Sequence, residues 1–169
     1  MSEKQQTVHI VTGLTGAGKT TYSLKLAEDR NAIRFSIDEW MARLFHPDMT
    51  ELSYEWIMDR IARCDGLIWR LAAEALERKI DVVLDLGFTT RAHRDAAATR
   101  AEQVGALSEV HFIDAAPEVR RARVRQRNEE KPQDLYAFEV NDFMFDFMEP
   151  RFERPDETEL VRGVHVVTG

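Results

Sequence analysis

Cysteine is almost absent from this chain, which has Cys64 alone among its 169 residues. A single cysteine cannot form an internal disulfide, so a reducing compartment is the natural setting. Long apolar runs are missing as well, and residues 1–6 are polar and lack the apolar segment of a secretory signal. These absences lead us to expect a cytoplasmic protein with no membrane partner. Cys64 itself falls in an amphipathic pattern that favours a buried core thiol over a nucleophile.

Positive charge is also scarce, since 23 Lys and Arg residues face 30 Asp and Glu residues and leave a net charge of −7. The phosphate backbone of a nucleic acid rewards clustered positive charge, so this balance disfavours a nucleic-acid partner, although it is compatible with a local basic patch. The 5 histidines show no metal-ligand spacing, and we expect no metal other than Mg²⁺. The length and the ordinary globular composition, 44% hydrophobic and 31% charged, favour a single domain over residues 1–169.

Near its start the chain carries the pattern G-x-x-x-x-G-K-T, which cradles nucleotide phosphates in P-loop proteins. An apolar, β-branched segment at 7–12 predicts a strand that runs into this loop, and helix-forming residues follow it. The backbone N–H groups of such a loop point at the phosphates, and the helix N-terminus adds partial positive charge. Lys19 would bridge the β- and γ-phosphates, and Thr20 would place its hydroxyl on Mg²⁺. The expected nucleotide-binding residues are Gly13, Leu14, Thr15, Gly16, Ala17, Gly18, Lys19, Thr20 and Thr21.

Four further strands are predicted, at residues 31–37, 81–86, 109–114 and 164–167. The aliphatic run at 81–86 is the strongest of them, because it is typical of a strand buried on both faces. Helical patterns lie between the strands: one at 57–75 with Gly66 as its weak point, one at 91–103, and one that opens at Pro117. A fourth apolar stripe, expected to belong to the core, is formed by Tyr136, Val140, Phe143 and Phe147. Strands that alternate with helices predict an α/β fold with a parallel sheet.

Two aspartates follow predicted strands, at the edge of the sheet where α/β proteins bind ligands. Asp38 comes after the second strand, where it could accept the proton of an attacking hydroxyl, hold the acceptor, or merely cap the helix that contains Trp40. Asp85 ends the most apolar strand and is typical of an aspartate that holds Mg²⁺, with a strand-end turn residue as the alternative. Because a buried charge is costly unless a cation or donor compensates it, the metal role of Asp85 is favoured.

Arginines are dense between residues 120 and 127. On a helix, Arg120, Arg123 and Arg127 share one stripe, while Arg121 points elsewhere. Guanidinium groups can neutralise the charge that develops on a transferred phosphoryl group, and a solvated basic face is the alternative.

Other side chains near the predicted strand ends leave two interpretations open. Arg91 and Arg94 could bind an acceptor or form surface ion pairs. Trp40, Phe45 and Trp56 flank the segment after Asp38, where they could line an acceptor pocket or pack as a hydrophobic patch.

Taken together, these pieces resemble the small P-loop kinases of the AAA-type ATP-binding group, which are related to the zeta-toxin, chloramphenicol phosphotransferase and polynucleotide kinase families. The resemblance covers nearly the whole chain. Its motifs are the loop at 13–20, Ser36-Ile37-Asp38, the segment from Val83 to Arg91, the helix at 117–128, and the Phe-Glu-x-Pro-x-Glu turn at 152–157. One departure is Leu86-Gly87-Phe88 after Asp85, where relatives often carry an Asp-Ala-Thr-Asn pattern, so the acceptor contacts of those relatives do not transfer.

The resemblance implies a three-layer fold with a five-stranded parallel sheet in the order 2-3-1-4-5 and a helical lid over residues 117–131. It implies that Asp38 is the catalytic base, that Thr20 and Asp85 hold Mg²⁺, and that Arg123 and Arg127 close over the reaction. The turn at 152–157 would lie beside the nucleotide base.

We therefore expect Mg²⁺-dependent transfer of the γ-phosphate of ATP to a hydroxyl of a small-molecule acceptor. ATP is preferred because the sequence contains no N-K-x-D guanine-binding motif. The alternatives are a kinase for a nucleic-acid 5′-hydroxyl or a nucleotide sugar, and a slow ATPase switch that acts through a protein partner. A pocket between Asp38, Arg91 and Trp56 would favour the kinase, and a flat surface there would favour the switch.

Overall fold

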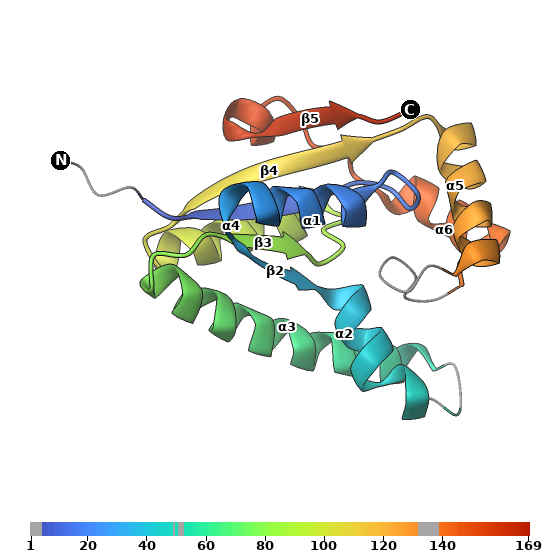
Figure 1. Cartoon of the computed structure of the whole chain (residues 1–169), viewed down its shortest axis with the longest axis horizontal. Helices are drawn as coiled ribbons and strands as arrows, with labels where there is room; N and C mark the ends of the chain where they lie inside the picture. The colour runs from blue at the N-terminus through green and yellow to red at the C-terminus, as the bar shows by residue number, and fades with distance from the viewer. Residues whose placement is uncertain (1–4, 49, 51–52, 132–138) are drawn as a thin grey trace.

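A single five-stranded sheet with the strand order β2-β3-β1-β4-β5 forms the centre of the fold (Figure 1). The computed structural model describes residues 5–48, 50, 53–131 and 139–169. The strands are β1 (Thr7–Thr12), β2 (Ile33–Ser36), β3 (Val82–Asp85), β4 (Leu107–Asp114) and β5 (Val164–Val167). All neighbouring strands pair in parallel, which confirms the predicted sheet and its order.

Helices connect the strands and extend past the carboxyl edge of the sheet. They are α1 (Lys19–Arg30), α2 (Ile37–Leu44), α3 (Tyr54–Glu77), α4 (Arg91–Gln103), α5 (Pro117–Glu130) and α6 (Asp142–Met148), with short 3₁₀ turns at His46–Asp48, Glu149–Arg151 and Glu159–Arg162. Figure 1 shows α5 and α6 beyond the points of the strand arrows, at the same end of the sheet as α2. Within the described residues, no helix combines the length and apolar character that crossing a membrane requires.

The two faces of the sheet are covered by different helices, which gives the three predicted layers. On β3, the side chains of Val82 and Leu84 pack in the larger core cluster with α3 and α4. Val83 points to the opposite face and packs with Leu26 of α1. This alternation is the period of two that a strand imposes, and it explains why β3 is apolar at every position before Asp85.

The second strand, β2, is shorter than the sequence predicts because the local backbone conformation ends it early on both sides. Asn31, the expected first residue of the second strand, adopts a left-handed conformation with φ of 51° and ends α1, so β2 begins only at Ile33. Ile37 already belongs to α2. Gly66 lies on the exposed side of α3, and the helix runs through it without a break. Cys64 is buried, as expected.

The expected core stripe around α6 is largely wrong. Phe143 is 75% exposed and Phe147 is 46% exposed, whereas Phe145 is only 2% exposed. The helix has 7 residues and packs one side against α5, where Phe145 meets Val124 and Val140. Tyr136 falls outside the described residues.

Candidate active site

The loop between β1 and α1 brings its backbone close to neighbouring chain segments, which only glycine permits. A Cβ on Gly13 would lie 2.2 Å from the carbonyl oxygen of Ile113, and one on Gly16 would lie 2.5 Å from that of Arg120. Gly18 has φ of 99° and precedes the first residue of α1, so the helix begins at Lys19 with its N-terminus at the loop. The Lys19 ammonium donates a hydrogen bond of 3.2 Å to the carbonyl of Leu14. The loop thus has the geometry of an anion cradle.

A cleft of about 740 Å³ opens over this loop at the carboxyl edge of the sheet. It collects nearly all of the predicted site residues: Gly13, Leu14, Thr15, Gly16, Gly18, Lys19, Thr20, Thr21, Asp38, Asp85, Arg123 and Arg127. Ala17 belongs to the same loop, but its side chain is buried in the core with Val11 and Leu26. The predicted residues therefore share one cavity, although they come from four separate parts of the chain.

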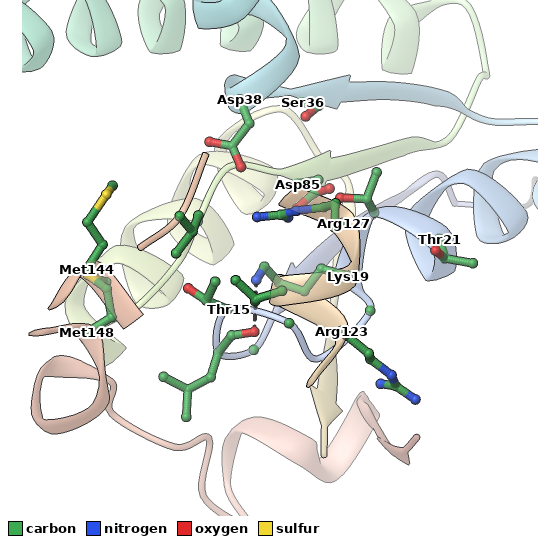
Figure 2. A pocket seen from close by; sticks show the side chains of 18 of the residues that line it. Thr15, Lys19, Thr21, Ser36, Asp38, Asp85, Arg123, Arg127, Met144 and Met148 are labelled. Carbon is green, nitrogen blue, oxygen red and sulfur yellow. Dashed lines mark hydrogen bonds between the residues drawn. The ribbon is translucent and has the colours of Figure 1, made fainter. Parts of the chain in front are cut away.

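Asp38 faces this cleft from the first turn of α2. The side chain that caps α2 is Ser36, which accepts a hydrogen bond of 3.4 Å from the backbone N–H of Glu39, so the capping alternative for Asp38 is wrong. Figure 2 shows the Asp38 carboxylate pointing into the cavity above Lys19. Solvent reaches this carboxylate through the open side of the cleft, while the walls remove part of its hydration and raise its pKa. The negative charge of Asp85 raises the pKa further, and Lys19 partly offsets it.

Lys19 lies deeper in the same cavity, and its electrostatics mirror those of Asp38. Loss of hydration lowers the pKa of the ammonium, while the carboxylates of Asp85 and Asp38 act in the opposite direction. The charges of Lys19, Asp38 and Asp85 thus interact electrostatically within the cleft.

A buried arginine that the sequence analysis did not single out orders this part of the site. Arg34 of β2 donates to Asp85 at 3.1 Å, to the Ser23 hydroxyl at 2.7 Å and to Glu39 at 2.6 Å. It joins β3, α1 and α2, and Glu39 is the neighbour of Asp38. One feature of the sequence could have revealed this role: Arg34 is an arginine inside a short predicted strand, where burial of an unpaired charge would cost free energy.

The oxygen donors of Thr20 and Asp85 suit Mg²⁺. Among the described residues, Arg34 and Ser23 donate hydrogen bonds to the Asp85 side chain, and both bonds fall on Oδ2, so that Oδ1 can serve a cation or its water. Hydroxyl and carboxylate oxygens are the hard ligands that Mg²⁺ prefers. The residues present therefore fit this ion.

The arginines of α5 divide into two groups. Arg127 and Arg123 line the cleft: Arg127 points toward Asp85 and Asp38, whereas Arg123 turns away and donates a hydrogen bond of 2.8 Å to Thr168 (Figure 2). The positive charge of Arg127 acts on both Lys19 and Asp38.

The other three arginines of the run, Arg120, Arg121 and Arg125, bind carboxylates in α6 or directly after it. Arg120 is buried, pairs with both oxygens of Glu149 at 2.6 and 3.0 Å, and donates to the carbonyl of Thr15 in the loop. Arg121 pairs with Asp142 and Asp146 outside the cleft. Arg120 thus shares the predicted stripe but has a structural role.

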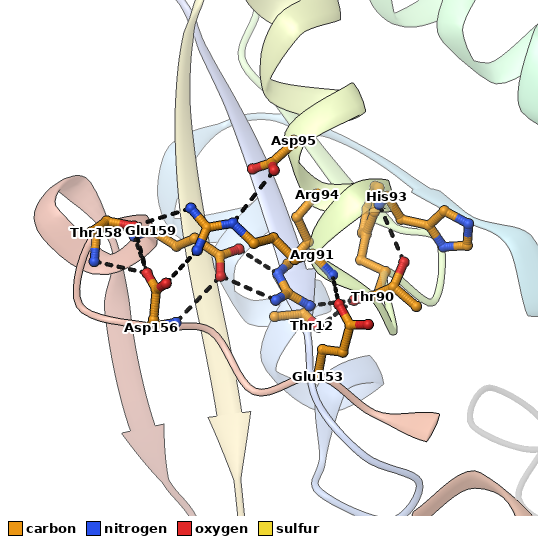
Figure 3. A network of polar contacts seen from close by, with 11 residues as sticks. Thr12, Thr90, Arg91, His93, Arg94, Asp95, Glu153, Asp156, Thr158 and Glu159 are labelled. Atoms are coloured by element: carbon orange, nitrogen blue, oxygen red, sulfur yellow. Dashed lines mark hydrogen bonds and ion pairs between the residues drawn. The ribbon is translucent and has the colours of Figure 1, made fainter. Parts of the chain in front are cut away.

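Arg91 and Arg94 do not line the cleft but connect the start of α4 to the segment before β5 (Figure 3). Arg94 is 1% exposed, and it donates to both carboxylate oxygens of Glu159 at 2.6 and 3.1 Å and to the carbonyl of Phe88. The exposed Arg91 pairs with Asp156. An acceptor role for these two arginines is not supported.

The expected pocket between Asp38, Arg91 and Trp56 is wrong in its composition. Trp56 packs edge-on against Phe45, and Trp40 packs against the core, so these aromatics form the hydrophobic patch. The cleft beside Asp38 is lined instead by Glu39, Ala42, Arg43, Met144 and Met148. No pattern in the sequence pointed to Met144 and Met148 of α6. Only the packing of α6 on α5 brings them to the cavity.

The sequence model of the AAA domain family matches residues 8–155. The chain belongs to this family. A comparison with curated proteins gave no match.

Solved structures of low sequence identity share the fold of this AAA-domain chain. Kti12 from Chaetomium thermophilum in complex with ADP-AlF3 has a TM-score of 0.70 and 18% identity, over 95% of this chain and 88% of that one. The APS kinase CysC from Mycobacterium tuberculosis, in complex with AMPPNP and APS, has a TM-score of 0.65 and 16% identity, over 98% and 90%. A gluconokinase from Sinorhizobium meliloti 1021 has a TM-score of 0.63 and 17% identity, over 98% and 84%. The chain thus has the fold of P-loop kinases.

We expect Arg94→Ala to lower the free energy of unfolding by about 3 to 5 kcal/mol, because it leaves the buried carboxylate of Glu159 without its partner. Arg91→Ala, which breaks an exposed pair on the same helix turn, should cost about 1 kcal/mol or less. Urea unfolding curves of the two variants check this difference. Equal, small losses would contradict the structural role of Arg94.

Proposed function

We propose that this protein catalyses Mg²⁺-dependent transfer of the γ-phosphate of ATP to a hydroxyl group of a small molecule. The observation that carries the proposal is the position of Asp38. Its carboxylate is not used as a helix cap and faces Lys19 inside the cleft formed by the P-loop. A carboxylate with a raised pKa at this place is suited to accept the proton of an attacking hydroxyl.

Each part of the cleft then has a definite task. Lys19 and the N–H groups of the loop hold the phosphates, and Thr20 with Asp85 would hold Mg²⁺, which neutralises phosphate charge. The acceptor oxygen forms a bond to the γ-phosphorus, the bond from that phosphorus to the bridging oxygen of ADP breaks, and the hydroxyl proton passes to Asp38. Arg127 lies where it can neutralise the charge on the transferred group.

The acceptor side of the cleft supports a small molecule over a polymer or a partner protein. Two acidic side chains, Asp38 and Glu39, and one basic side chain, Arg43, line it, and this balance of charge does not favour a phosphate backbone. The cleft does not reach Arg91 or Trp56, but it extends beyond Lys19 to Asp38, Met144 and Met148, and this space beside the P-loop supports a kinase over a switch that only hydrolyses ATP. The APS kinase among the structural neighbours holds AMPPNP together with APS, which is consistent with an adenine nucleotide and a small acceptor in this fold.

Lys19→Ala should weaken ATP binding at least about tenfold, because it removes a charge-assisted contact to the phosphates. Lys25→Ala is the matched control, since Lys25 lies on the same helix with its ammonium exposed and paired to Asp29. Isothermal titration with ATP and Mg²⁺ measures both affinities. Unchanged affinity in Lys19→Ala would remove the P-loop from the mechanism.

Asp38→Asn should lower phosphoryl transfer by roughly a hundredfold or more while ATP affinity stays nearly constant, because the amide cannot accept the proton. The assay is ADP release from Mg·ATP stimulated by pools of hydroxyl metabolites, with Asp48→Asn in the exposed turn after α2 as control. The base must be ionised, and the partial loss of hydration in the cleft raises the pKa of Asp38, so the wild-type rate should fall as the pH falls through that raised pKa. Asp38→Asn should lose this acid limb. Full transfer activity in Asp38→Asn would exclude the general-base role.

Arg127→Ala should lower the transfer rate roughly a hundredfold and ATP affinity much less, because a contact that strengthens in the transition state acts on the barrier. Arg123→Ala should have a smaller effect, since its guanidinium turns toward Thr168, and Arg121→Ala should have the least. Steady-state kinetics of the three variants give the order. Three equal, small losses would mean that the arginine run is only a solvated face.

A further inference from the structure

Three side chains with metal-ligating atoms converge on the face of the sheet that α1 covers. His9 of β1 is the register partner of Glu109 on β4, and His111 follows two residues later on the same face. The distances are 3.0 Å between His9 Nδ1 and His111 Nε2, 3.1 Å between His9 Nδ1 and Glu109 Oε2, and 3.6 Å between His111 Nε2 and Glu109 Oε2. Both imidazoles are 1% exposed. The cluster lies in the middle of β1, away from the P-loop.

When Glu109 is ionised, one bifurcated hydrogen bond is enough to link these three side chains, and it leaves no proton between His111 Nε2 and Glu109 Oε2. Each imidazole nitrogen carries either a proton or a lone pair, so a single shared proton can link His9 to both of its neighbours. The contact between His111 Nε2 and Glu109 Oε2 then joins two lone pairs. A cation at the centre can instead be ligated by all three atoms, with the proton of His9 carried on Nε2 rather than Nδ1.

The surroundings fix the orientation of the His111 ring. Burial and the neighbouring His9 lower the pKa of His111 to about 4. The Tyr22 hydroxyl of α1 lies 2.8 Å from His111 Nδ1 and orients the ring from behind, as a partner of a metal-bound histidine does. Burial raises the pKa of Glu109, and the positive charge of Arg30, at the end of α1, partly offsets this rise while it also opposes a cation.

We propose that His9, Glu109 and His111 form a binding site for a divalent first-row transition metal, with Zn²⁺ as the best match. Metal–ligand bonds of about 2.0–2.1 Å in tetrahedral geometry place the ligand atoms about 3.3 Å apart, close to the observed triangle. Two imidazoles and one carboxylate suit Zn²⁺ and disfavour Mg²⁺, so the site is distinct from the one at Thr20 and Asp85. A bound ion would tie β1 to β4 beneath α1 and stabilise the base of the P-loop.

The spacing of the histidines in the sequence does not indicate this site. His9 is about a hundred residues from its partners in the sequence, and only the β1–β4 register brings them together. The remaining signal was the alternation Glu109-x-His111, which puts both side chains on one face of a strand.

The test is Zn²⁺ and Co²⁺ binding to the whole chain in excess Mg²⁺. Wild-type protein should bind one ion, gain about 5 to 10 °C in Tm at a hundredfold excess over Kd, and give the visible Co²⁺ spectrum of a four-coordinate site without a thiolate band. Glu109→Gln and His111→Gln should each weaken binding about a hundredfold or more. His165→Gln, which alters an exposed histidine of β5, is the matched control and should bind as the wild type does.

Tyr22→Phe keeps the proposal testable if the buried His111→Gln variant does not fold. It should fold and bind Zn²⁺ about tenfold more weakly, because it loses only the group that orients His111. Unchanged affinity in both Glu109→Gln and Tyr22→Phe would place the ion elsewhere and overturn the proposal, as would the absence of Zn²⁺ binding to the wild type. Since the readouts are affinity, spectrum and Tm, the result does not depend on the proposed kinase activity.

Discussion

One buried guanidinium holds together the elements that form the candidate site. Arg34 is 8% exposed, and its three contacts reach Asp85 of β3, Ser23 of α1 and Glu39 of α2. The contact with Asp85 fixes the carboxylate expected to meet Mg²⁺, and the contact with Glu39 fixes the helix turn that presents Asp38. A charge in this position is costly to desolvate, so its partners must all be in place for the fold to tolerate it. The geometry of the cleft therefore depends on Arg34 although Arg34 does not line it.

Two further buried arginines repeat this arrangement around the cleft. Arg120 joins the P-loop carbonyl of Thr15 to Glu149 after α6, and Arg94 joins the start of α4 to Glu159 before β5. Planar, bidentate guanidinium pairs fix orientation as well as distance. Each of these pairs connects a helix that follows a strand to a distant segment, so ion pairs fix the position of the elements around the cleft.

The parts that could be predicted from the sequence are those with a local physical signature. The P-loop, the buried strand before Asp85 and the helix at 91–103 follow from spacing, apolar runs and helix periodicity, and the structure agrees with them. Phe143 and Phe147 were placed in the core because periodicity alone does not show which side of a short helix meets α5. Arg34 and the cluster of His9, Glu109 and His111 depend on strand pairing between distant segments, which no local pattern encodes.

The central claim is that the γ-phosphate of ATP goes to a hydroxyl of a small molecule held beside Asp38. Phosphorus NMR of the protein with Mg·ATP and a mixed pool of hydroxyl compounds follows that phosphate directly. The account predicts a new phosphate ester resonance that grows as the γ-phosphate signal falls, with ADP formed in equal amount. Inorganic phosphate as the sole product, formed at the same slow rate with and without the pool, would contradict it.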